Sequence, residues 1–199
     1  MPRPEREQLI LDVAGPVFAR GGYHEASMDE IAKVAEVSKP MLYAYFGSKE
    51  GLYVAYIDRT GRELLDRLVR AGRVDGGAPA RLRARIDEFL AFVEEYREGW
   101  TVLFREACSS SPVAREVAAL REQIADAVRR MIESEVAAQS ELPGAASDAL
   151  AHAIVGAGES LANWWLEQRG VAREDVVAWY VNLVRASVAG ALRTARRPR

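Results

Sequence analysis

Start and stop signals for two short helices follow one another closely in SMDEIAKVAEVSKPMLYAYFGSKEGLY. Ser27 is a favoured N-cap residue, and Glu30 three positions later completes a capping box, in which each side chain binds the other residue's backbone N–H. Ser38 begins the second helix with Pro40 in its first turn, where the missing N–H does no harm. Gly47 ends that helix. Two short helices joined by a tight turn are typical of a helix-turn-helix, which places its second helix in the DNA major groove.

The rest of the chain has the apolar spacing of helices, and alternation typical of strands is nearly absent, so we expect an all-α fold. The first helix should run from about residue 3 to Arg20, with a kink at Pro16 and a stop at Gly21 and Gly22. Ser48 should cap a long fourth helix that follows the helix-turn-helix. Further helices are expected at about residues 80–97, 100–108, 112–139, 147–168 and 173–195, which makes nine or so in all.

Charge gives little support to nucleic-acid binding. The net charge is −2, and residues 1–50 hold six Lys/Arg against eight Asp/Glu, also a balance of −2. Affinity for DNA would therefore depend on where single charges lie, and binding should depend only modestly on salt. Hydrophobic residues make up 49% of the chain, which is enough for a packed core and argues against disorder.

The remaining composition excludes several function classes. One cysteine, Cys108, permits no internal disulfide and suits the cytoplasm, where we expect this chain, away from any membrane. The longest uncharged run, residues 149–158, is too short to span a bilayer, and the first residues have no signal-peptide core. No catalytic nucleophile–base pair, phosphate loop or Cys/His cluster is visible. We therefore expect no catalytic residues, no metal and no cofactor.

The second helix of the motif carries the candidate DNA contacts. Leu42 and Phe46 lie four positions apart and should face the core. The residues left near the exposed side include a lysine and two tyrosines, which bind phosphates through charge and hydroxyl groups and base edges through their rings. The alternative is a solvated helical hairpin with partly buried tyrosines. The residues expected on this surface are Lys39, Pro40, Met41, Tyr43 and Tyr45, with Lys49 at the start of the next helix.

These residues resemble the TetR/AcrR family of bacterial transcriptional regulators. The matching pieces are FARGGY, SMDEIAKVAEVS and KPMLYAYFGSKEGLY, in this order. The resemblance implies a DNA-binding domain at residues 1–50, a ligand-binding and dimerisation domain at residues 51–199, and nine or ten helices. It also implies a set of DNA-binding residues: Ser27, near a phosphate, Ser38, Lys39, Pro40, Met41, Tyr43, Tyr45 and Lys49.

This chain departs from the family pattern at two positions of that helix. Met41 stands where Thr or Ser is usual, and Tyr45 stands where His is frequent. Methionine has no hydroxyl to donate to a phosphate, but its side chain suits contact with a thymine methyl group. We expect the general mode of binding to persist with a different sequence preference.

The C-terminal region should hold an effector site and a dimer face. Large aromatic residues are candidates to line an apolar cavity, although ordinary core packing explains most aromatic residues equally well. The candidates are Phe92, Tyr96, Trp100, Phe104 and Trp164. The last two helices carry small residues, Ala149 to Ser160, and valines, Val177 to Val188, from which two copies could build a four-helix interface. Intramolecular packing of the same faces is the alternative.

The leading hypothesis is a ligand-responsive repressor that binds a palindromic operator as a homodimer and is released by a small apolar effector. The first alternative is an α-helical small-molecule-binding protein or enzyme without a DNA role, which the acidic pI of about 5.8 favours. The second is a structural helical scaffold, which would leave the exposed tyrosines unexplained.

Overall fold

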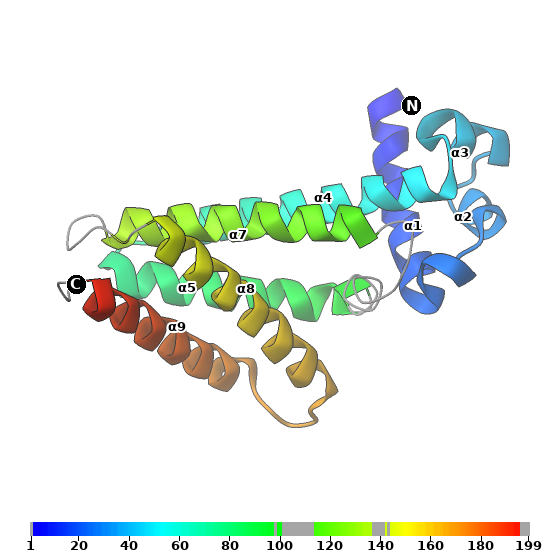
Figure 1. Ribbon diagram of the computed structural model, residues 1–199. Helices are drawn as coiled ribbons and strands as arrows, with labels where there is room; N and C mark the ends of the chain where they lie inside the picture. The colour runs from blue at the N-terminus through cyan, green and yellow to red at the C-terminus, as the bar shows by residue number, and fades with distance from the viewer. Residues whose placement is uncertain (1, 98, 101–113, 137–141, 143, 196–199) are drawn as a thin grey trace. The chain divides into compact units, whose positions relative to one another are not determined.

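The computed structural model describes residues 2–97, 99–100, 114–136, 142 and 144–195 (Figure 1). Over these ranges the chain forms eight helices and no strand, which confirms the all-α prediction. None of these helices is both long and apolar enough to cross a membrane. The helices are α1 (Arg3–Glu25), α2 (Met28–Val34), α3 (Lys39–Phe46), α4 (Lys49–Ala71), α5 (Gly77–Glu95), α7 (Ala114–Val136), α8 (Gly144–Glu167) and α9 (Arg173–Ala195).

The predicted helix boundaries are largely confirmed, with some corrections. Within α1 the helix breaks at Gly22 (φ 70°), which confirms the predicted stop at Gly21 and Gly22, and one more turn continues to Glu25; the backbone dihedrals stay helical at Pro16, where a kink was expected. Gly22 absorbs this bend because, with no Cβ, it adopts a positive φ at little cost. α5 and α8 begin a few residues earlier than expected, at Gly77 and Gly144. The short helix expected at residues 100–108, and Cys108 with it, lies outside the described residues except for its first position.

The chain forms two compact units, and the first comprises residues 1–62 and 96–120. Its core joins α1, α2, α3 and the first half of α4, the helices coloured blue to cyan in Figure 1. Phe18 and Tyr53 meet edge to face, with ring centroids 4.7 Å apart, and both are fully buried. The other fully buried side chains of this core are Ile10, Ala14, Ile31, Leu42, Leu52 and Ile57. This core positions the two short helices of the predicted motif.

The second unit comprises residues 63–95 and 121–199. In it α5, α8 and α9 pack on one another, and α8 and α9 are drawn in yellow to red in Figure 1. Two buried polar groups hold this packing. Trp165 Nε1 donates to the Val171 carbonyl at 3.0 Å, and the Tyr180 hydroxyl donates to the Ile154 carbonyl at 2.6 Å. The division at residue 50 predicted above concerns functional domains and stays a prediction.

Candidate functional site

Serine hydroxyls cap each helix of the predicted DNA-binding motif. Ser27 Oγ accepts from the backbone N–H of Glu30 at 3.4 Å at the start of α2. Ser38 Oγ accepts from the N–H of Met41 at 3.3 Å at the start of α3. Ser48 Oγ accepts from the N–H three residues on, at 2.9 Å, at the start of α4. All three predicted helix starts are confirmed, because a cap depends on residues close in sequence.

One of the two hydrogen bonds predicted for the capping box at α2 is formed, from the Glu30 N–H to Ser27 Oγ. The Glu30 carboxylate, expected to return to the N–H of Ser27, pairs instead with the Arg20 guanidinium of α1. A charge-assisted bond is stronger than a bond to a neutral backbone N–H, so the approach of Arg20 decides the geometry. The pair ties α2 to α1 across the bend at Gly22.

α3 turns Leu42 into the core and leaves a polar side outward. Leu42 is completely buried, whereas Tyr43 is 43% exposed. Tyr45 is half-buried and packs against the core of the first unit together with Phe46. Among the predicted DNA-binding residues, Ser38, Lys39, Pro40 and Tyr43 are exposed, and Ser27, Met41, Tyr45 and Lys49 are half-buried. The assignment of these residues to DNA contact stays a prediction.

Both lysines of this surface have partners within the protein. Lys39 Nζ donates to Asp29 Oδ2 of α2 at 2.9 Å, and this carboxylate raises the pKa of Lys39. Lys49 Nζ donates to the His24 carbonyl at 2.8 Å and lies 5.0 Å from the centroid of the Tyr23 ring. Partial burial lowers the pKa of Lys49. The two lysines that were expected to bind DNA are therefore engaged, at least in part, in contacts within the protein.

The predicted ligand-binding residues are distributed over both compact units. Phe92, in the second unit, is buried, and the Arg67 guanidinium lies 5.4 Å from the centroid of its ring. Tyr96 is half-buried and Trp100 is buried, and both belong to the first unit. Trp164 is 42% exposed. Phe104 lies outside the described residues, so the predicted effector site stays a prediction.

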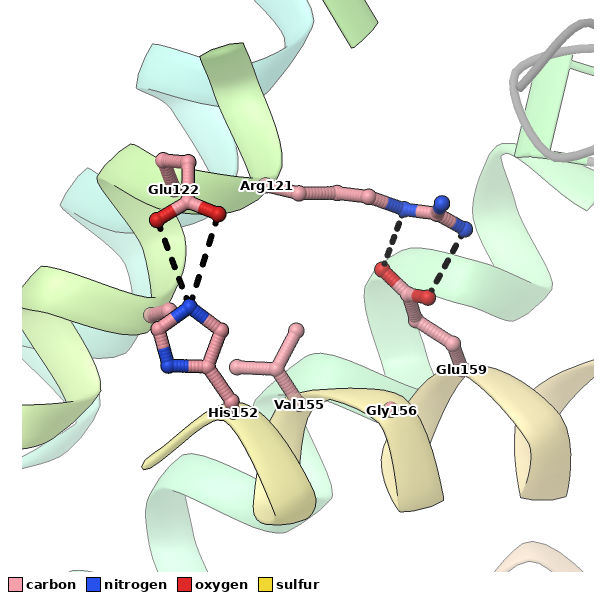
Figure 2. A pocket seen from close by; sticks show the side chains of 7 residues that line it. Arg121, Glu122, His152, Val155, Gly156 and Glu159 are labelled. Atoms are coloured by element: carbon pink, nitrogen blue, oxygen red, sulfur yellow. Dashed lines mark hydrogen bonds and ion pairs between the residues drawn. The ribbon is translucent and has the colours of Figure 1, made fainter. Parts of the chain in front are cut away.

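A small hollow of about 170 Å³ lies between α7 and α8 (Figure 2). Its walls carry two ion pairs. Glu122 of α7 faces His152 of α8 at 3.2 Å, and Arg121 faces Glu159 at 2.9 Å. Val155 and Gly156 form the stretch of α8 between these pairs. The α7 partners of His152 and Glu159 stand 30 and 38 positions earlier in the sequence, so no local pattern indicates these pairs.

The pKa values of His152 and Glu159 in this hollow are both shifted from their ordinary values. The Asp148 carbonyl, followed by the Glu122 carboxylate, raises the pKa of His152. Since both neighbours accept hydrogen bonds, the ring fits best when both nitrogens carry protons. Burial raises the pKa of Glu159, and Arg121 opposes that shift. The described residues hold no group of three or more metal-ligating side chains, here or elsewhere.

The faces of α8 and α9 divide differently from the predicted dimer face. Val177, Val181 and Val184 are buried in the core of the second unit, so their assignment to an intermolecular face is wrong and intramolecular packing is correct. The apolar residues left exposed are Trp164 (42%), Trp179 (51%) and Leu183 (50%). The two tryptophan rings lie 6.3 Å apart. Small exposed residues, Ala149, Ala153, Gly156 and Ser160, follow the same side of α8.

Comparison with known proteins matches both parts of the chain. Residues 10–56 match the family model of bacterial regulatory proteins of the tetR family, and residues 79–187 match a tetracyclin repressor-like C-terminal domain. The HTH-type transcriptional activator FasR of Mycolicibacterium smegmatis is 35% identical over 179 residues, which cover 89% of this chain and 80% of that protein. The HTH-type transcriptional regulator RutR of Escherichia coli K12 is 30% identical over 54% of this chain and 50% of its own length.

Solved structures agree with this match over nearly the whole chain. A TetR-like transcriptional regulator from Rhodococcus sp. RHA1 is 33% identical with a TM-score of 0.72, covering 96% of this chain and 99% of that one. A tetR-family regulator from Streptomyces coelicolor is 30% identical with a TM-score of 0.81, covering 96% and 83%. The predicted alternatives of an enzyme and a structural scaffold are thereby set aside. With capped helices α2 and α3 and matches to both domains, the chain belongs to the TetR family of helix-turn-helix transcriptional regulators.

Proposed function

We propose that this protein is a repressor that binds a palindromic operator with α3 in the major groove. One observation carries the proposal: Tyr43 is exposed beside Lys39 and Pro40 on a helix that buried Leu42 fixes to the core. Exposed aromatic side chains beside a lysine suit phosphate and base-edge contacts. The capped starts of α2 and α4 flank this helix in the chain, and helix N-termini favour phosphate oxygens.

The repressor acts as a homodimer through α8 and α9 in this proposal. Trp164, Trp179 and Leu183 expose apolar surface on these two helices, and large exposed apolar side chains that gather on one face mark an interaction site. A two-fold dimer presents two recognition helices about 34 Å apart, which matches one turn of DNA. Sedimentation of only monomer at micromolar concentration would contradict the dimer.

A small apolar effector binds the C-terminal part of the chain and releases the protein from DNA in this proposal. Phe92, Tyr96 and Trp100 supply aromatic surface, and α4 carries residues of both compact units, which makes it the candidate link. An effector acts by binding one arrangement of the protein more tightly than the other. Operator affinity that no apolar ligand changes would contradict this part.

Transcriptional activation is the second candidate, because the FasR relative at 35% identity is an activator. A reporter gene placed behind an operator obtained by selection of bound DNA distinguishes repression from activation. Deleting the regulator should raise expression from a repressed promoter and lower expression from an activated one.

Tyr43 provides the direct test of the DNA-binding surface. Replacing Tyr43 by Ala should weaken operator binding about tenfold or more, because a group that contacts DNA is lost, while an exposed position leaves folding unchanged. Tyr43→Phe is the matched variant, since it keeps the ring and removes only the hydroxyl. Operator affinity is measured by gel-shift titration and folding by thermal unfolding. Unchanged affinity in Tyr43→Ala would refute the assignment of α3.

A further inference from the structure

Two arginine side chains from the start of α1 contact α3, the helix proposed to enter the major groove. The Arg3 guanidinium carbon lies 5.1 Å from the centroid of the Tyr45 ring. Arg6 Nη1 approaches Met41 Sδ at 3.8 Å. The contacts reach α3 from 35 positions earlier in the sequence for Arg6 and 42 for Arg3, and all of these residues belong to the first compact unit. The two arginines therefore meet α3 at the two positions where this chain departs from its family's usual residues.

These contacts position the guanidinium groups without neutralising them. An aromatic ring and a thioether are weak partners, and guanidinium carries five N–H donors in a planar fork. Among the described residues neither Arg3 nor Arg6 forms an ion pair with a carboxylate, in contrast to Lys39. Arg3 is exposed and Arg6 is half-buried. Most of their N–H donors are therefore available to an anionic partner beside Met41 and Tyr45.

We propose that Arg3 and Arg6 bind phosphates of the DNA backbone beside the base pairs that α3 reads. This inference rests on the DNA-binding function proposed above and adds two cationic contacts to it. Arginine suits the role because its fork binds phosphate oxygens bidentately. Glu5 and Glu7 stand at the same helix start and cancel its net charge. The contribution of Arg3 and Arg6 to DNA binding therefore depends on their contacts with α3. A count of charges along the sequence cannot reveal it.

Met41 and Tyr45 gain a second role from this arrangement. Each supports an arginine that binds the backbone, so the side chains at these two positions set where the phosphates are held as well as what the helix reads. The modest salt dependence expected from two lysines alone is accordingly too small.

Salt dependence of operator binding tests the proposal. Fluorescence anisotropy with a labelled operator compares the full-length wild type with the double variant Arg3→Gln/Arg6→Gln. Because each of the two protomers on the operator contributes Arg3 and Arg6, the variant loses four phosphate contacts, and the slope of log affinity against log salt should fall by about 3.6. Between about 50 and 200 mM salt, the wild-type dimer should then lose about 150-fold more affinity than the variant. Arg3→Lys/Arg6→Lys keeps the charges and should retain most of the slope.

The matched control is Arg73→Gln/Arg83→Gln, which removes the same charge from two exposed arginines of the second unit and should leave the slope unchanged. A wild type that binds the operator with a slope equal to that of the Arg3→Gln/Arg6→Gln variant would overturn this inference and leave the proposed function intact. A wild type that binds no duplex DNA would overturn the proposed function itself. Thermal unfolding of each variant verifies that the fold is retained.

Discussion

Replacing Gly51 by Ala should destabilise the turn that sets α3 against α4. A Cβ at this position would lie 2.0 Å from the Phe46 carbonyl oxygen, whereas real Cβ atoms essentially never come within 3.0 Å of such an atom. One of the two must therefore move by about 1 Å. The carbonyl cannot move freely, because it accepts from the N–H of Ser48 at 2.8 Å. Gly51 is held as well, because its own N–H donates to Ser48 Oγ at 2.9 Å.

The expected cost follows from two opposing effects. Alanine in place of glycine inside a helix gains about 1 kcal/mol of helix propensity. Overpacking that shifts backbone costs about 1–3 kcal/mol and occasionally more, and here the clash also strains two hydrogen bonds of the turn. We expect a net loss of about 1–2 kcal/mol in the free energy of unfolding, taking the upper part of that range. For a chain of this length this lowers the unfolding midpoint by about 2–8 °C.

Thermal unfolding followed by circular dichroism measures this change. Gly144→Ala is the matched control, because a Cβ at Gly144 meets nothing within 4 Å at the start of α8. Its midpoint should stay the same or rise slightly. If Gly51→Ala is as stable as Gly144→Ala, the close approach of α3 and α4 described here is refuted.

Three further substitutions probe contacts between helices. Asp29→Asn should strengthen operator binding and raise the salt slope by about 1.8, because Lys39 of each protomer loses its ion pair and turns to phosphate; unchanged anisotropy titrations would contradict this. Gly158→Ala should lower stability by about 1–3 kcal/mol in chemical denaturation, since its Cβ would lie 2.6 Å from the buried Tyr180 hydroxyl; wild-type stability would contradict the packing of α8 on α9. His152 has a raised pKa, so its protonation stabilises the fold fully below the unfolded pKa of about 6.5, and this is lost as pH rises through the folded pKa. The difference in unfolding midpoint between the wild type and His152→Gln should therefore be larger at about pH 5.5 than at about pH 8.5. Equal differences at the two pH values would refute this stabilising role of protonated His152.

The features predicted correctly from sequence are those that depend on near neighbours. The caps at Ser27, Ser38 and Ser48 bind N–H groups three residues away, so their identity and spacing are sufficient to place α2, α3 and the start of α4. The inward position of Leu42 follows from helical periodicity in the same way. The all-α fold of the described residues was predictable for the same reason, because helical periodicity is also a local pattern.

The features that sequence reasoning missed depend on which helices meet. Glu30 binds Arg20 instead of completing its capping box, and Lys39 binds Asp29, because in each case a charged partner from another helix competes with the local one. The valines of α9, Val177 among them, have the same spacing whether they face a second copy or the chain's own core. Periodicity identifies an apolar face and leaves its partner undetermined.

The arginines at the start of α1 are the clearest instance of this limit. Arg3 and Arg6 stand beside two glutamates in a neutral segment, and only the folded contact with Tyr45 and Met41 separates the charges that reach α3 from those that do not. Local charge counts therefore underestimated the cationic character of this surface.

Selection of bound duplexes from a random DNA pool by the full-length protein tests the central claim most directly. We expect enrichment of one palindromic sequence whose half-sites are separated by about one helical turn, and loss of that enrichment in Tyr43→Ala. A pool that remains random after repeated rounds with the folded wild type would contradict the claim that α3 reads an operator.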